Sequence, residues 1–399
     1  MSILVLNTGS STLKFALFDE LAHEQLARGV IDWQSQPDKV TLELQTQAVS
    51  QTRSRSDISN NSDAVKWILH VLADTNLGES IRAVGHRIVH GGTNFCQPTL
   101  INEQVLKSLE QVSELAPLHN PPALITIKAA QNILPEATHV AVFDTAFFAD
   151  LPPSAYVYPI PYKWYEQYGI RRFGFHGISH EYCSTRAAEV LGRQNDDSLR
   201  LVICHLGNGC SATAVHGGRP LATTMGFTPL EGLMMGTRSG SIDPGILIYL
   251  MTQQGFDPER LDQSLNHQSG LLGVSGISSD FRQIEQASQT NNERAQLAMK
   301  MFIERIQSTI GSLAVLVGGI DGLVFTAGIG EHSPKLRSCV CDKLPFLGLK
   351  LDEVKNQSAH ADCDLATIQS AGRILLIQTR EEQMIARETE RLFELSQSR

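Results

Sequence analysis

Two arginines of this chain lie in glycine-rich segments, where a guanidinium group can clamp an anion. Arg87 lies in His86-Arg-Ile-Val-His-Gly-Gly92 and Arg238 in Gly236-Thr-Arg-Ser-Gly240. Neither segment has helical periodicity, which argues against a solvated helix face, the ordinary place for an arginine. A guanidinium fork holds a planar anion in a fixed orientation better than a lysine does. Anion binding is therefore the chemistry that we weigh against a plain surface charge.

Three small-residue turns follow apolar runs and could meet phosphate groups. The first, Asn7-Thr-Gly-Ser-Ser-Thr-Leu-Lys14, is either an ordinary hairpin turn or a loop whose backbone N–H groups and lysine hold a phosphate. Leu201–Val215 repeats this design around Gly207-Asn-Gly209, and Gly328–His332 follows a third apolar run. Such turns favour a nucleotide cleft between two similar halves. The chain has no G-x-x-x-x-G-K-[ST] motif, which excludes a P-loop.

Alternating apolar and amphipathic segments must position these turns. The predicted strands are Ala83–Val89, His139–Phe143, Leu199–His205, Gly322–Ala327 and Arg373–Gln378. The predicted helices are Asn102–Leu115, Pro122–Ile133, Ser179–Leu191, Arg294–Leu316 and Glu381–Leu395. This alternation indicates an α/β architecture. We expect the polar segment Ser50–Ser62 to be an exposed loop, and the prolines between 152 and 161 to mark a domain boundary.

Composition narrows the classes of partner and compartment. The chain has 399 residues, enough for two domains, and its 42% hydrophobic and 19% charged residues are typical of globular proteins. A net charge of −9 argues against nucleic acid or an anionic membrane as a partner. Seven cysteines without a C-x-x-C pair favour reduced thiols. Ser312–Gly330 is too interrupted by Asp321 and glycines to span a membrane, so we expect a cytoplasmic protein.

The motifs, taken together and in order, resemble the acetokinase family of the acetate and sugar kinase, heat-shock cognate and actin superfamily. They include N-T-G-S-S-T-L-K-F at 7–15, G-H-R-I-V-H-G-G at 85–92, A-P-L-H-N-P-P at 116–122, V-F-D-T-A-F at 142–147, R-R-F-G-F-H-G-I-S-H at 171–180, H-L-G-N-G at 205–209, F-T-P-L-E-G-L-M-M-G-T-R-S-G at 227–240, S-S-D-F-R at 278–282 and F-T-A-G-I-G-E at 325–331. The resemblance covers essentially the whole chain.

The resemblance implies an α/β fold of two domains with duplicated actin-like (ribonuclease H-like) cores and a nucleotide cleft between them. We expect domains at 1–150 and 151–384, with a C-terminal helix at about 385–399 that packs back on the first domain. The implied activity is reversible, Mg²⁺-dependent in-line transfer of the ATP γ-phosphoryl group to acetate, giving acetyl phosphate and ADP. Mn²⁺ is an alternative metal, and a homodimer is implied. Alternatives are a propionate or other short-chain carboxylate kinase and, more remotely, a non-catalytic ATP-driven binding protein of the actin or chaperone type.

The resemblance assigns four residues to the reaction. Arg87 clamps the carboxylate, Arg238 stabilises the transition state and His176 hydrogen-bonds the transferring phosphoryl group. In this family Asp144 is often described as a proton donor or acceptor. Acetate is already ionised at pH 7 and needs no base, so we favour a role in orienting an arginine or the water shell of Mg²⁺.

The remaining expected contacts also follow from the resemblance. Acetate is expected to meet Arg87, Val89, Leu118, His119 and Pro229. The nucleotide is expected to meet Lys14, His205, Leu206, Gly207, Asn208, Gly209, Asp280, Phe281, Arg282, Gly328, Ile329, Gly330, Glu331 and His332. Magnesium contacts are expected from Asn7 and Glu381, through water where the ion keeps its hydration.

Overall fold

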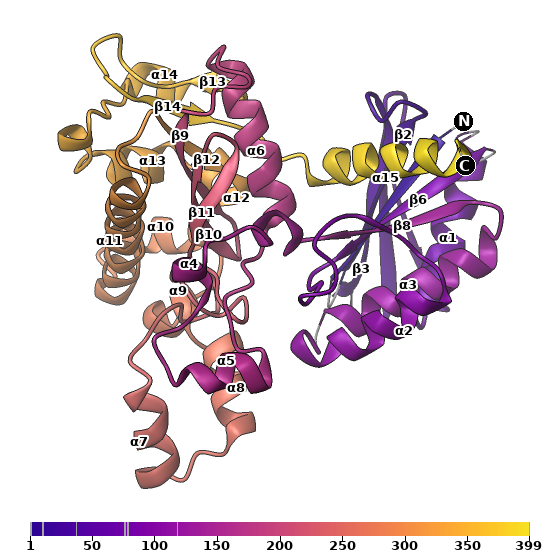
Figure 1. The fold of residues 1–399 in the computed structure, drawn as a ribbon, viewed down its shortest axis with the longest axis horizontal. Helices are drawn as coiled ribbons and strands as arrows, with labels where there is room; N and C mark the ends of the chain where they lie inside the picture. The colour runs from indigo at the N-terminus through magenta and orange to yellow at the C-terminus, as the bar shows by residue number, and fades with distance from the viewer. Residues whose placement is uncertain are drawn as a thin grey trace. The chain divides into compact units, whose positions relative to one another are not determined.

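The chain divides into two compact units in a computed structural model. The structure describes residues 2–398 except 10, 11, 37, 76, 78, 79 and 118, and it leaves out the side chains of 34–36. The first unit comprises Met1–Ala149 with Arg380–Arg399, and the second comprises Asp150–Thr379. Figure 1 shows a mixed α/β arrangement in each unit. Among the described residues, no helix is both long enough and apolar enough to cross a membrane.

The first unit is built on an eight-stranded sheet with the order β5-β4-β3-β2-β1-β6-β8-β7. Its strands are β1 (Ser2–Thr8), β2 (Thr12–Asp19), β3 (Gln25–Gln36), β4 (Lys39–Thr46), β5 (Ser50–Arg55), β6 (Ile81–Ile88), β7 (Thr99–Leu100) and β8 (Thr138–Phe143). Strands β1 to β5 pair antiparallel in sequence, whereas β6 and β8 run parallel to β1.

Helices cover both faces of this sheet. They are α1 (Asn61–Asp74), α2 (Glu103–Val112), α3 (Asn120–Ile133) and α15 (Glu381–Gln397), with 3₁₀ turns at Ser113–Leu115 and Ala146–Phe148. Successive side chains of a strand point to opposite faces, so Val84 joins the core under α1 and α3, whereas the Cα of Gly85 faces Ile385 and Thr389 of α15. Glycine is required at 85 because a side chain there would overlap these two. The C-terminal helix therefore packs on the sheet of the first unit (Figure 1).

The second unit repeats this topology in a six-stranded sheet with the order β11-β10-β9-β12-β14-β13. Its strands are β9 (Arg200–Leu206), β10 (Cys210–His216), β11 (Arg219–Thr223), β12 (Gly322–Thr326), β13 (Cys363–Asp364) and β14 (Arg373–Leu376). Strands β9, β10 and β11 are antiparallel, and β12 and β14 run parallel to β9. Because β1, β2, β3, β6 and β8 have the same order and directions, the two sheets share one five-stranded core topology.

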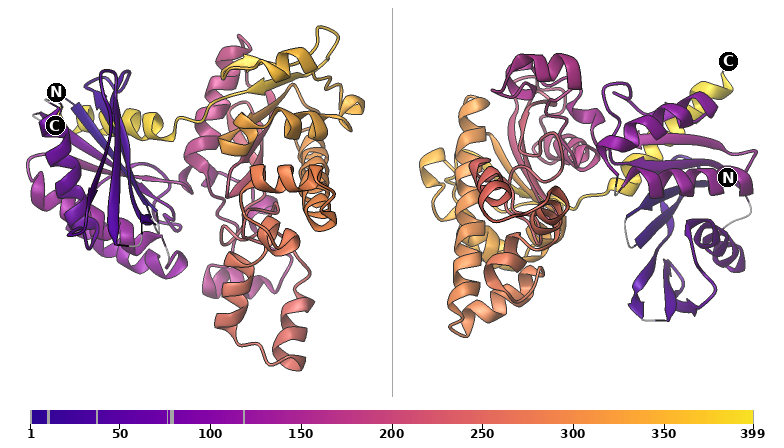
Figure 2. Two further views of the ribbon diagram at one scale, coloured as in Figure 1. Left: turned by 180° about the vertical axis from the view of Figure 1, so that it is seen from behind. Right: turned by 90° about the horizontal axis from the view of Figure 1, so that it is seen from below.

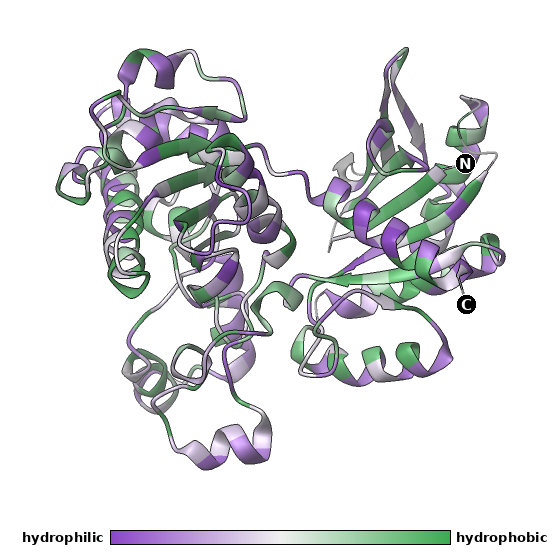
Figure 3. Cartoon of the chain, turned by 45° about the horizontal axis from the view of Figure 1, so that its top comes forward, coloured by the Kyte–Doolittle hydropathy of each residue, from purple (hydrophilic) through white to green (hydrophobic). Residues whose placement is uncertain are grey.

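Helices also flank the second sheet. They are α4 (Pro153–Tyr156), α5 (Tyr162–Tyr168), α6 (Gly177–Val190), α7 (Gly245–Gln253), α8 (Pro258–His267), α9 (Gly270–Ser275), α10 (Phe281–Gln289), α11 (Glu293–Leu316), α12 (Ala327–His332), α13 (Pro334–Cys341) and α14 (Glu353–Gln357), with a 3₁₀ turn at Pro345–Leu347. Helices α6 and α11 lie on opposite sides of the strands in both Figure 1 and Figure 2. Figure 3 shows the central strands as largely hydrophobic, as burial on both faces requires.

Two local expectations from the sequence were wrong. Ser50–Arg55 is not a loop but the strand β5, which pairs with β4 and whose side chains are exposed or half-buried. An edge strand with no buried side chain has no hydrophobic alternation to reveal it. The glycine turn expected at 328–332 is the short helix α12, which begins at Ala327. Contacts from Glu331 and Arg337, described below, hold that helix.

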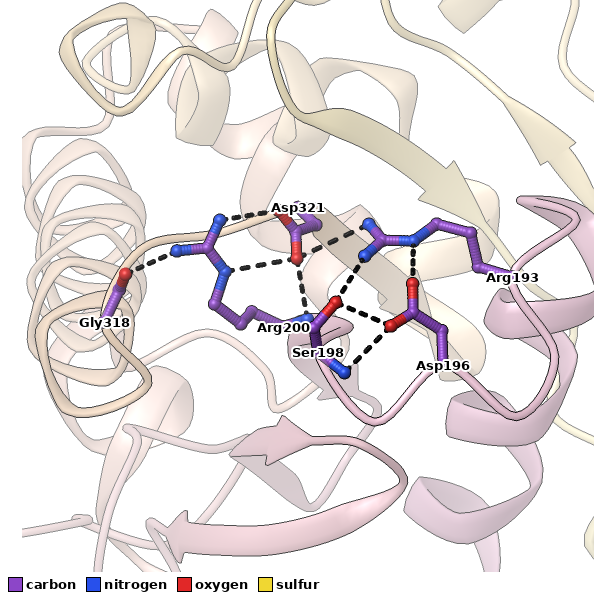
Figure 4. A network of polar contacts seen from close by, with 6 residues as sticks. All are labelled: Arg193, Asp196, Ser198, Arg200, Gly318 and Asp321. Atoms are coloured by element: carbon purple, nitrogen blue, oxygen red, sulfur yellow. Dashed lines mark hydrogen bonds and ion pairs between the residues drawn. The ribbon is translucent and has the colours of Figure 1, made fainter.

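An arginine–aspartate network ties the first residue of β9 to the residue that precedes β12 (Figure 4). Asp321 accepts hydrogen bonds from the backbone N–H of Arg200 at 2.9 Å and from its guanidinium at 2.7 and 3.2 Å. Arg193 lies 3.5 Å from the same carboxylate and also bonds Asp196 at 2.7 Å. Burial opposes the charge of Asp321, but the hydrogen bonds from Arg200 outweigh it and keep the pKa of this carboxyl below its ordinary value.

We expect Asp321→Ala to lower the free energy of unfolding of the second unit by about 1–3 kcal/mol, because it leaves partly buried donors of Arg200 without an acceptor. Thermal unfolding would measure this loss. The network lies at the start of β9, whereas the glycine turn follows the end of that strand, so the expected nucleotide contacts of that turn should not change. A variant as stable as the original chain would show that the network is only a surface ion pair.

Candidate active site

In the first unit, three of the sequence motifs converge where β6 and β8 end. Parallel strands end at the same edge of a sheet, which brings the segments after them together. The side chain of Asn120 accepts from the N–H of His90 at 3.2 Å and donates to its carbonyl at 2.9 Å. The hydroxyl of Thr145 accepts from the N–H of Gly91 at 3.0 Å. These bonds join the segments 85–92, 116–122 and 142–147.

Arg87 is held by two partners on neighbouring strands. Its Nε and Nη2 donate to the two carboxylate oxygens of Asp144 at 3.1 and 2.6 Å, and its Nη1 donates to Oδ1 of Asn7 at 3.0 Å. Burial disfavours the charge of Arg87, but Asp144 and then Glu381 raise its pKa above the ordinary value. The guanidinium is therefore permanently charged and fixed in orientation by a bidentate pair.

Glu381, the first residue of α15, adds a second carboxylate to this group. Burial is the main cause that raises its pKa from 4.5 to about 7, with Asp144 and Glu382 adding to the effect and Arg87 and Lys14 opposing it. A carboxylate that is hard to ionise in this way would be stabilised by an additional cation. Lys14 is exposed on β2, directly opposite Asn7 in the β1–β2 register.

Two further expected acetate contacts of the first unit, Val89 and His119, lie on segments next to Arg87 and α3. Val89 is half-buried immediately after β6, and His119 is half-buried at the residue before α3. The two hydrogen bonds between the neighbouring Asn120 and the backbone of His90 bring these two segments together. Leu118 lies outside the described residues.

In the second unit, the turn between β9 and β10 carries the glycines expected to meet phosphate. The N–H of Gly207 donates to the carbonyl of Gly209 at 3.0 Å, and the carbonyl of Asn208 accepts from the N–H of Gly236 at 3.0 Å. Asn208 packs so closely on Gly236 that a side chain at 236 would overlap it. The glycine at 236 therefore allows the segment that carries Arg238 to approach this turn.

Arg238 is half-buried and has few protein partners. Its Nη1 makes a long contact of 3.4 Å to the carbonyl of Pro229, and no ion pair joins it to a carboxylate within the described part of the chain. Burial lowers its pKa from the ordinary value, and the nearby Cys210 offsets this only in part. An arginine kept away from carboxylates in a partly desolvated position is suited to bind an anionic ligand.

His176 lies beside the same turn in a strained backbone conformation. Its φ of 60° is in the left-handed region, at the residue that precedes α6. Its ring stacks on that of His205 with centroids 4.2 Å apart. A Cβ built on Gly209 would lie 3.3 Å from Nε2 of His176 and 3.9 Å from Nη1 of Arg238, so the two side chains converge on Gly209. Strain of this kind persists only where surrounding contacts enforce it.

A cavity of about 290 Å³ in the second unit collects much of the expected nucleotide site. It is lined by Gly207, Asn208, Asp280, Phe281, Arg282, Gly328, Ile329 and His332, together with Glu285 and Ser333, which the sequence analysis did not identify. Of the other expected residues in this unit, His205, Leu206 and Gly209 belong to the adjacent strand and turn, whereas Gly330 and Glu331 lie in α12. The cavity therefore joins three sequence motifs that lie far apart along the chain.

Glu331 and Arg337 do not line this cavity but hold α12, which contributes to its wall, through hydrogen bonds to backbone groups. The carboxylate of Glu331 accepts from the N–H groups of Ala327 at 2.9 Å and Thr379 at 3.0 Å. Arg337, which is almost fully buried, donates to the carbonyls of Gly330 and Glu331 at 2.8 Å each. Sequence inspection missed Arg337 because, apart from Oδ1 of Asn356, its partners are backbone oxygens, which leave no residue-type signature.

A second supporting group fixes the segment that carries Pro229. Arg172 donates to Glu231 at 2.6 Å, and the hydroxyl of Tyr158 bonds the same carboxylate while accepting from the N–H of Phe227 at 2.8 Å. A larger cavity of about 970 Å³ lies beside this group, along α11 and β11, and contains none of the expected site residues. Volume alone therefore does not identify the site.

Comparisons with known proteins show the family to which the chain belongs. The sequence profile of the Acetokinase family matches residues 2–387. Acetate kinase of Nostoc punctiforme is 48% identical over 97% of this chain and 98% of its own length. Acetate kinase of Caldanaerobacter subterraneus subsp. tengcongensis is 47% identical over 98% of this chain and 99% of its own length.

Solved structures show the same likeness and confirm the expected fold class. A propionate kinase from Francisella tularensis superposes with a TM-score of 0.92 at 38% identity, covering 98% of this chain and 99% of that one. Acetate kinase from Porphyromonas gingivalis gives a TM-score of 0.90 at 40% identity, with the same coverage. The resemblance inferred from the motifs is confirmed: the chain belongs to the acetokinase family and is a phosphotransferase whose acceptor is a carboxylate.

Proposed function

We propose that the protein transfers the γ-phosphoryl group of ATP to acetate, reversibly and in line, giving acetyl phosphate and ADP. The observation that carries the proposal is Arg238, a half-buried guanidinium without a carboxylate ion pair among the described residues, which converges with His176 on Gly209. In phosphoryl transfer the protein contributes mainly position and electrostatic stabilisation. Arg238 and the His176 ring supply donors for the equatorial oxygens of the transferring group.

Arg87 is the residue proposed to bind the carboxylate of acetate, the phosphoryl acceptor. Two guanidinium nitrogens bind Asp144, and the third bonds the neutral amide of Asn7, a partner that a carboxylate can outcompete. Acetate is ionised at neutral pH, so its attack needs orientation and charge neutralisation rather than a base. Asp144 then acts by holding Arg87 charged and in place.

The proposed nucleotide site consists of the cavity of about 290 Å³ and the turn beside it. Backbone N–H groups of the turn at Gly207–Gly209 suit phosphate oxygens, and His205 lies at the end of the strand before that turn. The family pattern also assigns Lys14 to the nucleotide. Asp280–Arg282 and Gly328–His332 supply the walls against which the nucleoside part of ATP or ADP would lie.

Mg²⁺, or alternatively Mn²⁺, fits the residues expected to hold it. Glu381 has a pKa raised to about 7, mainly by burial, and Asn7 offers an amide oxygen. Within the described residues no cluster of three or more histidines, cysteines and acidic residues could hold a metal, so most ligands would be water and phosphate, as Mg²⁺ prefers. Bound there, the ion would neutralise charge on the phosphates.

The proposal also includes the oligomeric state and the compartment of the protein. A homodimer in the cytoplasm is supported by the family pattern and by exposed apolar side chains of α7, where Ile248 and Tyr249 are 59% and 55% exposed. All seven cysteines are free thiols, which agrees with a reducing compartment.

Acetate, propionate and butyrate should each be offered with ATP, and the acyl phosphate trapped with hydroxylamine. We expect the highest kcat/KM with acetate and a smaller, measurable value with propionate, because apolar pockets separate substrates by only about 1–3 kcal/mol per methylene. Higher activity with propionate would favour the second candidate function, a propionate kinase. The observation that favours this candidate is the likeness to the Francisella tularensis propionate kinase. No acyl phosphate with any of the three would refute the proposed function.

Asp144→Asn should lower kcat by about 100-fold or more while both limbs of the pH–rate profile remain, because the amide keeps the shape but not the charge that holds Arg87. Loss of one limb in this variant would instead support proton transfer by Asp144. Asp321→Asn is a matched control, since it alters another arginine–aspartate pair that lies at the start of β9.

Gly209→Ala should lower kcat by about 10- to 100-fold, because the new methyl group would push against the ring of His176 and misplace it relative to the phosphoryl group. Steady-state kinetics with ATP and acetate would measure the effect. Gly311→Ala in α11 is the control, since nothing lies within 4 Å of a Cβ there. Unchanged kcat in the Gly209 variant would show that His176 does not approach the transferring group.

Val89→Ala should raise the ratio of kcat/KM for propionate over acetate by about three- to tenfold, since each additional buried methylene contributes about 0.8 kcal/mol. The KM for ATP should hardly change. Parallel kinetics with both acids would measure the ratio. An unchanged ratio would place Val89 outside the acyl pocket, which would then have to be formed by other residues.

A further inference from the structure

The hydroxyl group of Ser211 lies between two histidine rings. Ser211 is fully buried on β10, and its Oγ is 2.9 Å from Nδ1 of His176 and 2.7 Å from Nε2 of His180. His180 is fully buried in α6, one turn after His176. Ser211 and His180 have no solvent exposure, so within this row only His176 can meet a ligand.

The two rings are the hydrogen-bond partners of Ser211 Oγ among the described residues. A hydroxyl that accepted from both would leave its own buried O–H without an acceptor, so the bonds in this row run in one direction. A serine hydroxyl donates one hydrogen bond, and a neutral imidazole has one N–H and one accepting nitrogen. Burial, with a smaller contribution from His205, lowers the pKa of His180 well below its ordinary value, so this ring is neutral. If Ser211 donates to His176 it must accept from His180, and if it donates to His180 it must accept from His176.

The ligand end of the row selects between these directions. Nε2 of His176 faces Gly209 and lies on the same side as Nη1 of Arg238. Phosphoryl oxygens accept hydrogen bonds, so an unprotonated Nε2 facing them would set two lone pairs against each other, whereas Nε2–H donates to them. A neutral His176 that carries its proton on Nε2 needs a donor at Nδ1, and Ser211 is that donor.

We propose that Ser211 and His180 are positioning residues that hold His176 in its Nε2–H tautomer, through hydrogen bonds that run from His180 to Ser211 and from Ser211 to His176. This rests on the proposed function, in which His176 donates to the transferring phosphoryl group. No proton moves along the row, and its effect is to fix the orientation and tautomer of one ring before ATP binds.

The tautomer can be read directly from the full-length protein labelled with ¹⁵N-histidine. Long-range ¹H–¹⁵N spectra distinguish a protonated from an unprotonated ring nitrogen, and the signals of His176 are those that disappear in His176→Asn. We expect Nε2 to be protonated in the unaltered chain. In Ser211→Ala we expect a mixture of tautomers, a fall in kcat of at least about tenfold and a KM for ATP within about twofold.

A matched pair at His180 separates the hydrogen bond from packing. His180→Gln keeps an N–H donor close to the position of Nε2, whereas His180→Leu has similar bulk and no donor. We expect the Gln variant to keep the Nε2–H tautomer of His176 and most of kcat, and the Leu variant to resemble Ser211→Ala. Circular dichroism and ADP binding would check that each variant folds. If the Leu variant does not fold, Ser211→Ala, which removes a single oxygen, decides alone.

Two results would overturn the proposal: a proton on Nδ1 of His176 in the unaltered chain, or a Ser211→Ala variant with the same tautomer and the same kcat. Failure of the proposed function is a separate result, because it is read from the hydroxylamine trap. The spectrum of the unaltered protein decides the tautomer in either case.

Discussion

A cation that is partly buried and yet not neutralised is the constraint on which the second unit depends. Arg238 loses solvation where it lies, and its pKa falls accordingly, but no carboxylate pairs with it among the described residues. Leaving a guanidinium in this state costs free energy, which only a bound anion recovers. The close approach of Gly236 to Asn208 is what keeps the arginine beside the β9–β10 turn rather than in solvent. The folded scaffold therefore holds Arg238 ready for an anionic ligand, as the proposed function requires.

In the first unit the arginine is paired with a carboxylate, whereas Arg238 is not, although the core strands of the two units have the same order. Arg87 is paired with Asp144 and Asn7 and remains charged in spite of its burial. In the proposed function this rigid mount suits an arginine that holds a small carboxylate, because such a ligand offers few other contacts that could orient it. The two arginines also occupy different places in the shared topology: Arg87 lies on β6, whose counterpart in the second unit is β12, whereas Arg238 lies in the loop between β11 and α7.

Backbone strain gathers beside the same turn. His176 and Ala327 both have φ values in the left-handed region, at 60° and 65°, although neither is a glycine. Such conformations cost of order 1 kcal/mol or more each and persist where tertiary contacts impose them. For Ala327 the contact is the carboxylate of Glu331 on its N–H, and for His176 it includes the hydroxyl of Ser211. The strain at these two residues therefore accompanies their placement beside the β9–β10 turn.

The sequence by itself determined the fold class and the family and predicted the segments proposed to form the site, because buried strands, amphipathic helices and glycine turns are local patterns with recognisable periods. It did not reveal β5, whose side chains are not buried, or the helical start at Ala327. Tertiary structure alone decided which atoms pair: Arg87 and Asp144 are 57 residues apart, and Ser211 lies 35 residues from His176. Hydrogen-bond partners of this kind are set by which strands become neighbours, a property of the packed sheet that no local pattern encodes.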